Sequence, residues 1–267
     1  MTKSEFKSFI KSVPKAELHI HIEAVITLAG IRKMYKNRFG KEMTKEEQTA
    51  LFSYNDLNGF IQAFLKVQDL FVSEKDFNVV FKELEKYLVR NGIDYCEAFF
   101  APTAFLKKGF SYEKMVEIFH KQIKRIKEKD GITIKLLMDV SRTFGCENAM
   151  KNYELLKQYP CEDIIGIGLG GAEAKGPAKE YAPVFQLAKK EGWRVVAHAG
   201  EDVGPESHTD STYRGISVRC TCSWWRSPRD RRIRPRSGYS SDLRRRVCRC
   251  GTEPLGYRCD SGPIRRR

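Results

Sequence analysis

The chain has 267 residues, which fits one large or two small domains, and its 41% of hydrophobic residues is typical of a globular protein. The net charge of +14 is unevenly divided: residues 1–207 have 26 Lys and 6 Arg against 29 acidic residues, while residues 208–267 have 16 Arg, no Lys and 5 acidic residues. The basic character therefore belongs to residues 208–267, here called the tail, and does not mark the first part as a nucleic-acid-binding domain.

No targeting or membrane segment is apparent. Charged residues interrupt positions 1–13, so they lack the apolar core of a signal peptide. No run approaches the ~20 apolar residues of a membrane span. Cys96, Cys146 and Cys161 are scattered, as expected of reduced thiols. We therefore expect a cytoplasmic protein with no membrane partner; the sequence does not indicate an oligomeric state.

Short apolar runs alternate with amphipathic segments through residues 1–207. The runs predicted as β-strands are Ala16–Ile22, Tyr95–Phe100, Ile132–Val140, Ile164–Leu169 and Arg194–His198. The segments predicted as helices, whose apolar residues recur every three or four positions, are Thr27–Tyr35, Lys45–Ser53, Leu57–Phe71, Glu74–Arg90, Tyr112–Lys129, Ala149–Gln158 and Lys179–Glu191. Helix-length crossovers predict parallel strands. This α/β pattern fits a (β/α)8 TIM-type barrel that stops after about five β/α units, and nearly as well an open doubly wound sheet.

Two of the predicted strands end in histidines. His19 and His21 share one face of the first strand, because alternate residues of a strand point to the same side, and both imidazoles can bind one metal ion. Val195–Ala197 is a buried strand that delivers His198 to its end, with Glu201 on the following loop. A glutamate sheltered beside a metal can act as a proton donor. Taken alone, each motif is also compatible with ordinary polar residues at a strand end or on a loop.

Residues 166–173, Gly-Ile-Gly-Leu-Gly-Gly-Ala-Glu, follow the fourth strand. Glycines at a strand end permit close approach of a ligand to the backbone. The run is a poor dinucleotide fingerprint, because no clean helix with an acidic ribose partner follows it. A plain turn is the alternative.

Together, Glu17-Leu18-His19-Ile20-His21, Gly171-Ala172-Glu173 and His198-Ala199-Gly200-Glu201 resemble the adenosine deaminase family of zinc hydrolases over roughly residues 14–207. That family is a (β/α)8 barrel that hydrolyses the 6-amino group of a purine.

The resemblance implies a role for several residues. One Zn2+ per chain would be bound by His19, His21 and His198. Glu201 would protonate the purine ring, and Gly171 would offer its backbone N–H to the ring edge. Phe60 and Phe64, four residues apart on a predicted helix, resemble the family's apolar gate over the purine, although such a pair is also common in a helix core.

One position departs from the family pattern. After the two histidines, adenosine deaminases have an apolar residue and then Asp-Gly, where the Asp meets the ribose; here Glu23-Ala24 follows. In this respect the sequence resembles relatives that have a Glu at this place and act on adenine or on modified nucleosides. We expect adenosine to be favoured over adenine, with adenine or a modified adenosine as the alternative substrate.

The tail lacks the rest of the family's site. The resemblance implies a water-orienting His on the sixth strand and an Asp pair on the eighth, but the tail contains neither Asp-His-Gly nor Ser-Asp-Asp, and His208 comes too early. The tail also lacks strand and helix periodicity, so we expect no stable native structure after about Ser207 and no useful turnover by this chain.

The tail itself has several interpretations. Its Arg, Cys, Ser, Gly, Pro and Trp content is typical of a shifted reading frame, which we favour; a chimeric join or a genuine appended tail are the alternatives. A genuine tail could make the chain a non-catalytic basic nucleic-acid-binding protein, through phosphate contacts and the Trp224-Trp225 pair. Cys220-x-Cys222 and Cys248-x-Cys250 are a weak indication of zinc, because the usual spacing is CxxC.

Overall fold

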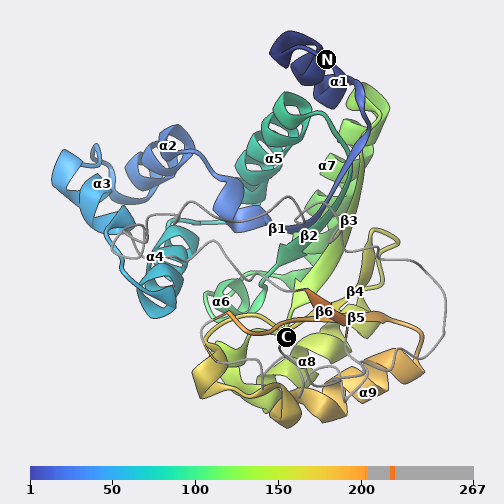
Figure 1. Cartoon of the computed structure of the whole chain (residues 1–267). Helices are drawn as coiled ribbons and strands as arrows, with labels where there is room; N and C mark the ends of the chain where they lie inside the picture. The colour runs from blue at the N-terminus through green and yellow to red at the C-terminus, as the bar shows by residue number, and fades with distance from the viewer. Residues whose placement is uncertain (202, 204–216, 220–267) are drawn as a thin grey trace, which may run out of the picture. The chain divides into compact units, whose positions relative to one another are not determined.

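A parallel β-sheet forms the centre of the computed structural model, which describes residues 1–201, 203 and 217–219 (Figure 1). Its strands are β1 (Lys15–His21), β2 (Ile93–Phe100), β3 (Thr133–Asp139), β4 (Ile164–Gly168), β5 (Arg194–His198) and β6 (Ser217–Arg219). Each strand pairs in parallel with the next one along the chain. This order has no switch point, so the curled half-barrel is present and the doubly wound sheet is excluded.

The five predicted strands are all present, each within two residues of its predicted bounds. The short strand β6 was not predicted and lies beyond Ser207. Its residues 217–219 pair with 196–198 of β5, whose outer edge would otherwise leave backbone N–H and C=O groups without ladder partners. The expectation of no stable structure after Ser207 is therefore wrong for these three residues. The remaining residues of the tail lie outside the described part of the chain.

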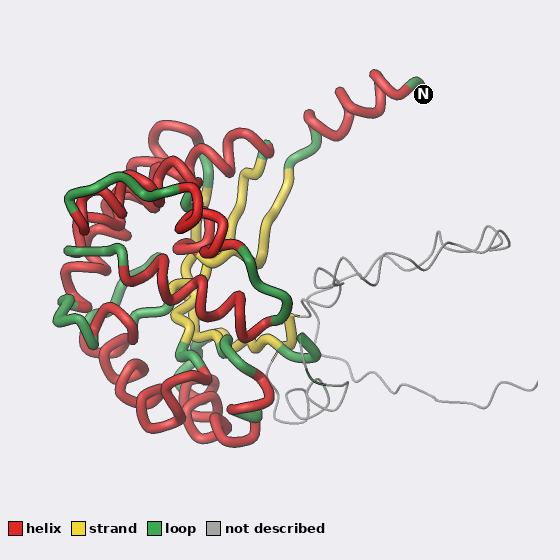
Figure 2. Tube along the Cα trace, turned by 90° about the vertical axis from the view of Figure 1, so that its left-hand side faces the viewer, coloured by secondary structure: helices red, strands yellow, loops and turns green. Residues whose placement is uncertain are grey.

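Helices connect the strands and cover the outer face of the sheet, as Figure 2 shows. The α-helices are α1 (Lys3–Ser12), α2 (Leu28–Phe39), α3 (Lys45–Phe52), α4 (Leu57–Asp69), α5 (Phe77–Asn91), α6 (Thr103–Leu106), α7 (Tyr112–Asp130), α8 (Gly145–Gln158) and α9 (Ala182–Lys190). Short 3-10 helices are η1 (Ile22–Val25), η2 (Glu74–Asp76), η3 (Arg142–Phe144), η4 (Glu173–Lys175) and η5 (Ala178–Tyr181). The long crossover between β1 and β2 holds α2 to α5, which agrees with the several helices predicted there.

Apolar side chains pack on both faces of the sheet. The main core lies between the sheet and its helices and contains fully buried aromatic residues such as Phe81 and Phe119. A smaller cluster of Phe99, Leu137 and Val196, from β2, β3 and β5, is separate from it. Phe99 also contacts the imidazoles of the inner face, so this small cluster forms the floor beneath the site.

Two glycines of β4 let its neighbours approach closely. A Cβ at Gly166 would collide with the backbone carbonyl of Arg194 in β5, and a Cβ at Gly168 would lie 2.5 Å from the Phe99 ring. Any larger residue at these positions would have to push β5 or Phe99 away. The glycines therefore bring β5, with His198 at its end, close to β4 and β2.

Helix α1 reaches away from the sheet in Figure 2, and none of its residues is buried. Thr2 and Glu5 form a reciprocal capping box at its start. Among the described helices, none combines the length and apolar character that crossing a lipid bilayer requires. The backbone contacts divide the chain into residues 1–227 and residues 228–267; the second unit lies wholly outside the described residues.

Candidate metal and substrate site

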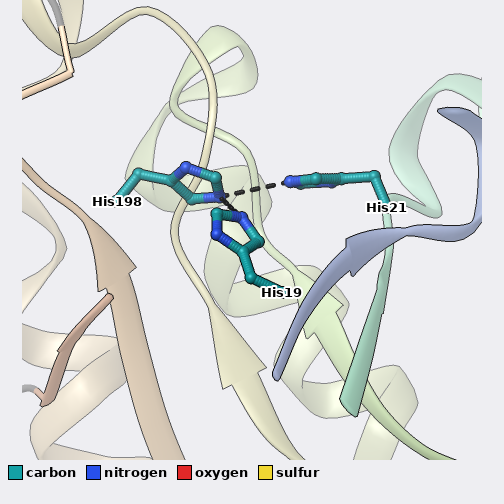
Figure 3. Close-up of side chains that lie close together, drawn as sticks. All are labelled: His19, His21 and His198. Atoms are coloured by element: carbon teal, nitrogen blue, oxygen red, sulfur yellow. Dashed lines mark hydrogen bonds between the residues drawn. The ribbon is translucent and has the colours of Figure 1, made fainter. Parts of the chain in front are cut away.

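The three predicted histidines meet at the C-terminal ends of their strands. His19 and His21 come from the end of β1 and His198 from the end of β5. The Nε2 atom of His198 lies 3.2 Å from Nε2 of His19 and 3.2 Å from Nε2 of His21 (Figure 3). Three nitrogens thus converge on one point, although 179 residues separate the outermost pair.

This arrangement fits a metal ion. Zinc–nitrogen bonds of ~2.1 Å in a tetrahedral site place neighbouring nitrogens about 3.4 Å apart, close to the spacing found here. Desolvation by the surrounding protein, and next the proximity of His198, lower the pKa of His21 to about 4. His21 is therefore neutral at pH 7, and a neutral imidazole has the lone pair that a metal requires.

Glu201 lies beside His198 on the loop after β5. Its Oε2 is 3.3 Å from Nδ1 of His198. The backbone N–H groups of Gly200 and Glu201 donate to the two carboxylate oxygens of Glu173, at 2.8 and 2.7 Å. Since Glu173 is 2% exposed, it fixes this loop from within the protein. Glu173 is the last residue of the glycine-rich segment 166–173, but the sequence alone indicated no role for it.

Arg142 fixes the other side of His198. The guanidinium of this buried residue donates to the carbonyl oxygens of His198 and Gly176. Tyr181 in turn donates from its hydroxyl to the Arg142 carbonyl, at 3.0 Å. Sequence reasoning missed Arg142, because a single arginine in a loop after a strand has no distinguishing pattern.

A cavity of about 470 Å³ opens in front of the histidines. Its wall contains all the predicted site residues except Glu23; the complete set is Glu17, His19, His21, Leu57, Phe60, Ile61, Phe64, Leu65, Gln68, Ala101, Ala104, Asp139, Ser141, Thr143, Phe144, Gly171, His198 and Glu201. Phe60 and Phe64 belong to α4, and the Phe64 ring lies edge-on to His21 at 6.1 Å. The cavity is therefore apolar along α4, apart from Gln68, and polar at the strand ends.

Gly171 contributes a backbone position that other residues would not adopt. Its φ is +92°, and a Cβ there would lie 3.1 Å from Oγ1 of Thr143. A side chain at this position would therefore be strained and crowded. Because Gly171 has no side chain, its backbone is accessible at the cavity wall.

Glu23 is fully buried behind that wall. Its Oε1 accepts the N–H of Ala101 at 2.9 Å and the side-chain amide of Gln68 at 3.4 Å. Within the described residues its Oε2 has no hydrogen-bond partner. Burial raises the pKa of Glu23 to about 7. Both Ala101 and Gln68 line the cavity, so the carboxylate lies one layer from it.

Asp139 is a further cavity residue that sequence reasoning missed. It ends β3 and is 5% exposed. Its Oδ1 accepts the N–H groups of Ser141 and Gly170, both at 2.9 Å. Functional residues of parallel α/β proteins often lie at the C-terminal ends of the strands, so the position of Asp139 near the end of a predicted strand could have identified it. His208 and the tail cysteines, by contrast, lie outside the described residues.

The comparisons with known proteins agree with this geometry. A family model described as adenosine deaminase matches residues 14–214. The adenine deaminase of Acinetobacter baylyi is 31% identical over 208 residues, covering 77% of this chain and 61% of that protein. The crystal structure of adenine deaminase from Arthrobacter aurescens is 25% identical, with a TM-score of 0.68 over 74% of this chain and 61% of that one.

A third similarity concerns the fold alone. An amidohydrolase from Burkholderia ambifaria, whose crystal structure contains bound zinc, is 19% identical with a TM-score of 0.72; the match covers 82% of this chain and 61% of that one. The chain thus spans about three fifths of the length of the relatives it matches.

Proposed function

Because the chain belongs to the adenosine deaminase family, we propose that its cavity binds a 6-aminopurine for hydrolytic removal of the amino group. The observation that carries the proposal is the convergence of His19, His21 and His198 at the cavity wall, with Glu201 beside them. In this proposal the three histidines hold one Zn2+. When bound, zinc supplies the Lewis acidity that makes water a nucleophile near neutral pH.

The other residues bind the substrate and move protons. Glu201 donates a proton to a ring nitrogen as water adds to the carbon that bears the amine. The N–H of Gly171 binds the purine edge, where its positive φ leaves the backbone uncovered. Phe60 and Phe64 cover the apolar face of the purine and keep bulk water out of the cavity.

For the substrate, adenine is the better proposal, in place of the adenosine favoured on motifs alone. A free base carries an N9–H donor that a nucleoside lacks. Gln68 lines the cavity and donates from its side-chain amide to Oε1 of the buried Glu23, which leaves the amide oxygen of Gln68 to accept that N9–H. The similarity to proteins named adenine deaminase supports the same choice. A modified adenosine stays the alternative.

Binding and turnover are separate parts of the proposal. The sequence lacks the family's Asp-His-Gly and Ser-Asp-Asp motifs, so we expect the zinc-loaded chain to bind purine but to turn over well below ~1 s⁻¹. Loss of a water-orienting group and of a carboxylate ligand typically costs orders of magnitude in rate.

Equilibrium dialysis of the full chain against adenine and adenosine, with zinc present, tests the binding. Adenine should bind more tightly than adenosine, and Gln68→Ala should reduce the difference. Conversion is followed in the same samples by the change in purine absorbance. Failure to bind any 6-aminopurine, together with unchanged zinc binding in His198→Ala, would refute the proposed site. Turnover of ~1 s⁻¹ or faster would instead refute the proposed loss of activity.

A further inference from the structure

A second group of metal-binding side chains lies at the opposite end of the sheet. His120 belongs to α7, while Cys161 and Asp163 lie in the loop that leads into β4. The proposed purine site is at the C-terminal ends of the strands, whereas this group precedes the N-terminal end of β4. The two clusters therefore share no residue.

One donor atom from each of the three residues lies within 4.8 Å of the other two. Nδ1 of His120 is 2.8 Å from Oδ2 of Asp163, and Sγ of Cys161 is 3.9 Å from the same oxygen. A tetrahedral zinc ion would place such N–O and S–O pairs about 3.3 and about 3.5 Å apart. Each distance differs from its ideal by about half an ångström or less. Rotation of the half-exposed His120 side chain can correct the first distance, and rotation of the half-buried Cys161 side chain can correct the second.

The combination of donors indicates which metal would bind. Imidazole, thiolate and carboxylate are all ligands of zinc, and a thiolate disfavours Mg2+ and Ca2+. A cavity of about 420 Å³ opens beside the group and contains His120 and Asp163 in its wall. It leaves room for a water molecule as the fourth ligand.

We propose that His120, Cys161 and Asp163 form a second site, for a thiophilic divalent cation of the zinc class. A bound ion would tie α7 to the loop before β4. Two features oppose binding and set its strength. Nζ of Lys135 lies 3.4 Å from Oδ1 of Asp163, and burial raises the pKa of the Cys161 thiol, so an ion must compete with a lysine and displace a proton.

A simpler interpretation is an ion-pair network of His120, Asp163 and Lys135 that never holds a metal. The two interpretations differ at Cys161, whose thiol gives an ion-pair network only a weak hydrogen bond to Asp163 but supplies a ligand to zinc. They also differ at Lys135, whose removal would weaken an ion-pair network but strengthen a zinc site.

Zinc titration of the full chain against a competing chelator tests the proposal. His120→Ala, Cys161→Ser and Asp163→Asn should each lower the number of zinc ions bound per chain by one, while Lys135→Met should raise the affinity of that ion. Cys146→Ser is the matched control, because Cys146 is also a half-buried free thiol but lies outside the group. It should leave the number unchanged.

The variants also separate the two sites. His198→Ala should remove a different zinc ion, so His198→Ala combined with His120→Ala should lose two. His120→Ala replaces a side chain that is 44% exposed, so a folding defect is not expected. An unchanged zinc count in His120→Ala or in Cys161→Ser would overturn the second site and leave the purine site untouched.

Discussion

Glu173 is the residue whose removal should most disturb the loop that carries Glu201. Its two oxygens accept the N–H groups of Gly200 and Glu201, and it is 2% exposed. In Glu173→Gln, an amide NH2 must face one of these N–H groups, which leaves a buried donor unsatisfied. We expect the free energy of unfolding to fall by about 1–3 kcal/mol. Urea unfolding measures this, with the exposed Glu180→Gln as control; equal effects in both variants would contradict the prediction.

A second prediction at this scale concerns the backbone at Gly171. Gly171→Ala adds both the strain of a positive φ and a contact of 3.1 Å with Thr143. The control Gly192→Ala has a similar φ of +88° and no heavy atom within 4 Å of the added Cβ. We expect each variant to lose about 1–2 kcal/mol from strain. Gly171→Ala should lose more, and should also weaken purine binding in dialysis. Equal losses of stability in the two variants would show that the close approach is unimportant.

The candidate histidines could be read from the sequence, because alternation along a strand and position at a strand end are local properties. Arg142 and Asp139 could not, since their roles depend on which backbone groups the fold brings near them. Glu23 shows the same limit. Its sequence position suggested a ligand-binding carboxylate, but only the packing of Gln68 and Ala101 places it behind the cavity wall.

Among the helices, α5 and α7 are held together by a charged contact that depends on pH. Hydrogen bonding to Arg125 is the main cause that lowers the pKa of Glu85 to about 2, and Lys129 contributes in the same direction. An ordinary glutamate has a pKa near 4.5. Because the folded value is the lower one, this stabilisation is fully present above about pH 4.5 and is lost as the pH falls toward 2.

Glu85→Gln should therefore destabilise the protein near neutral pH, and its difference from the unchanged chain should shrink on acidification. Urea unfolding at pH 7 and at about pH 3 measures this difference. Glu117→Gln, an exposed position on α7, serves as the control. A difference that stays constant over this pH range would show that the ion pairs contribute nothing.

The larger elements were predictable because buried strands and amphipathic helices repeat their pattern over many residues. α1 was not predicted, although Thr2 and Glu5 have the sequence spacing of a capping box. It buries no residue, so no pattern of core contacts revealed it. β6 escaped prediction for a related reason: three residues are too few to show a period, and pairing with β5 defines the strand.

At the scale of the whole molecule, the described residues include a group of exposed apolar side chains on α1 and the neighbouring strand β1. The exposed fractions are 49% for Phe6, 55% for Phe9, 43% for Ile10 and 45% for Leu18. In the described sheet, β1 also has a neighbour on one side only. An apolar surface next to an unpaired strand edge favours association between copies.

Replacing both Phe6 and Phe9 by Gln should therefore reduce self-association of the full chain. Sedimentation velocity over a range of protein concentrations measures it. Phe52→Gln on α3 is the control, because Phe52 is 51% exposed but stands apart from α1 in the sequence and fold. Equal behaviour of the two variants would assign the association to another surface.

The meeting of His19 with His198 has a mechanical consequence. Their strands, β1 and β5, are separated by β2, β3 and β4, so their imidazoles can touch only while the sheet bends by the right amount. The bend is a shared property of every strand between them, including the glycines of β4 that bring β5 inward. A metal ion bound by both strands would cross-link the two sides of the curved sheet and would close a loop of 179 residues. Substitutions that flatten the sheet, even far from the histidines, would then lower the affinity for the ion. Loss of the ion would in turn allow the curvature of the sheet to decrease.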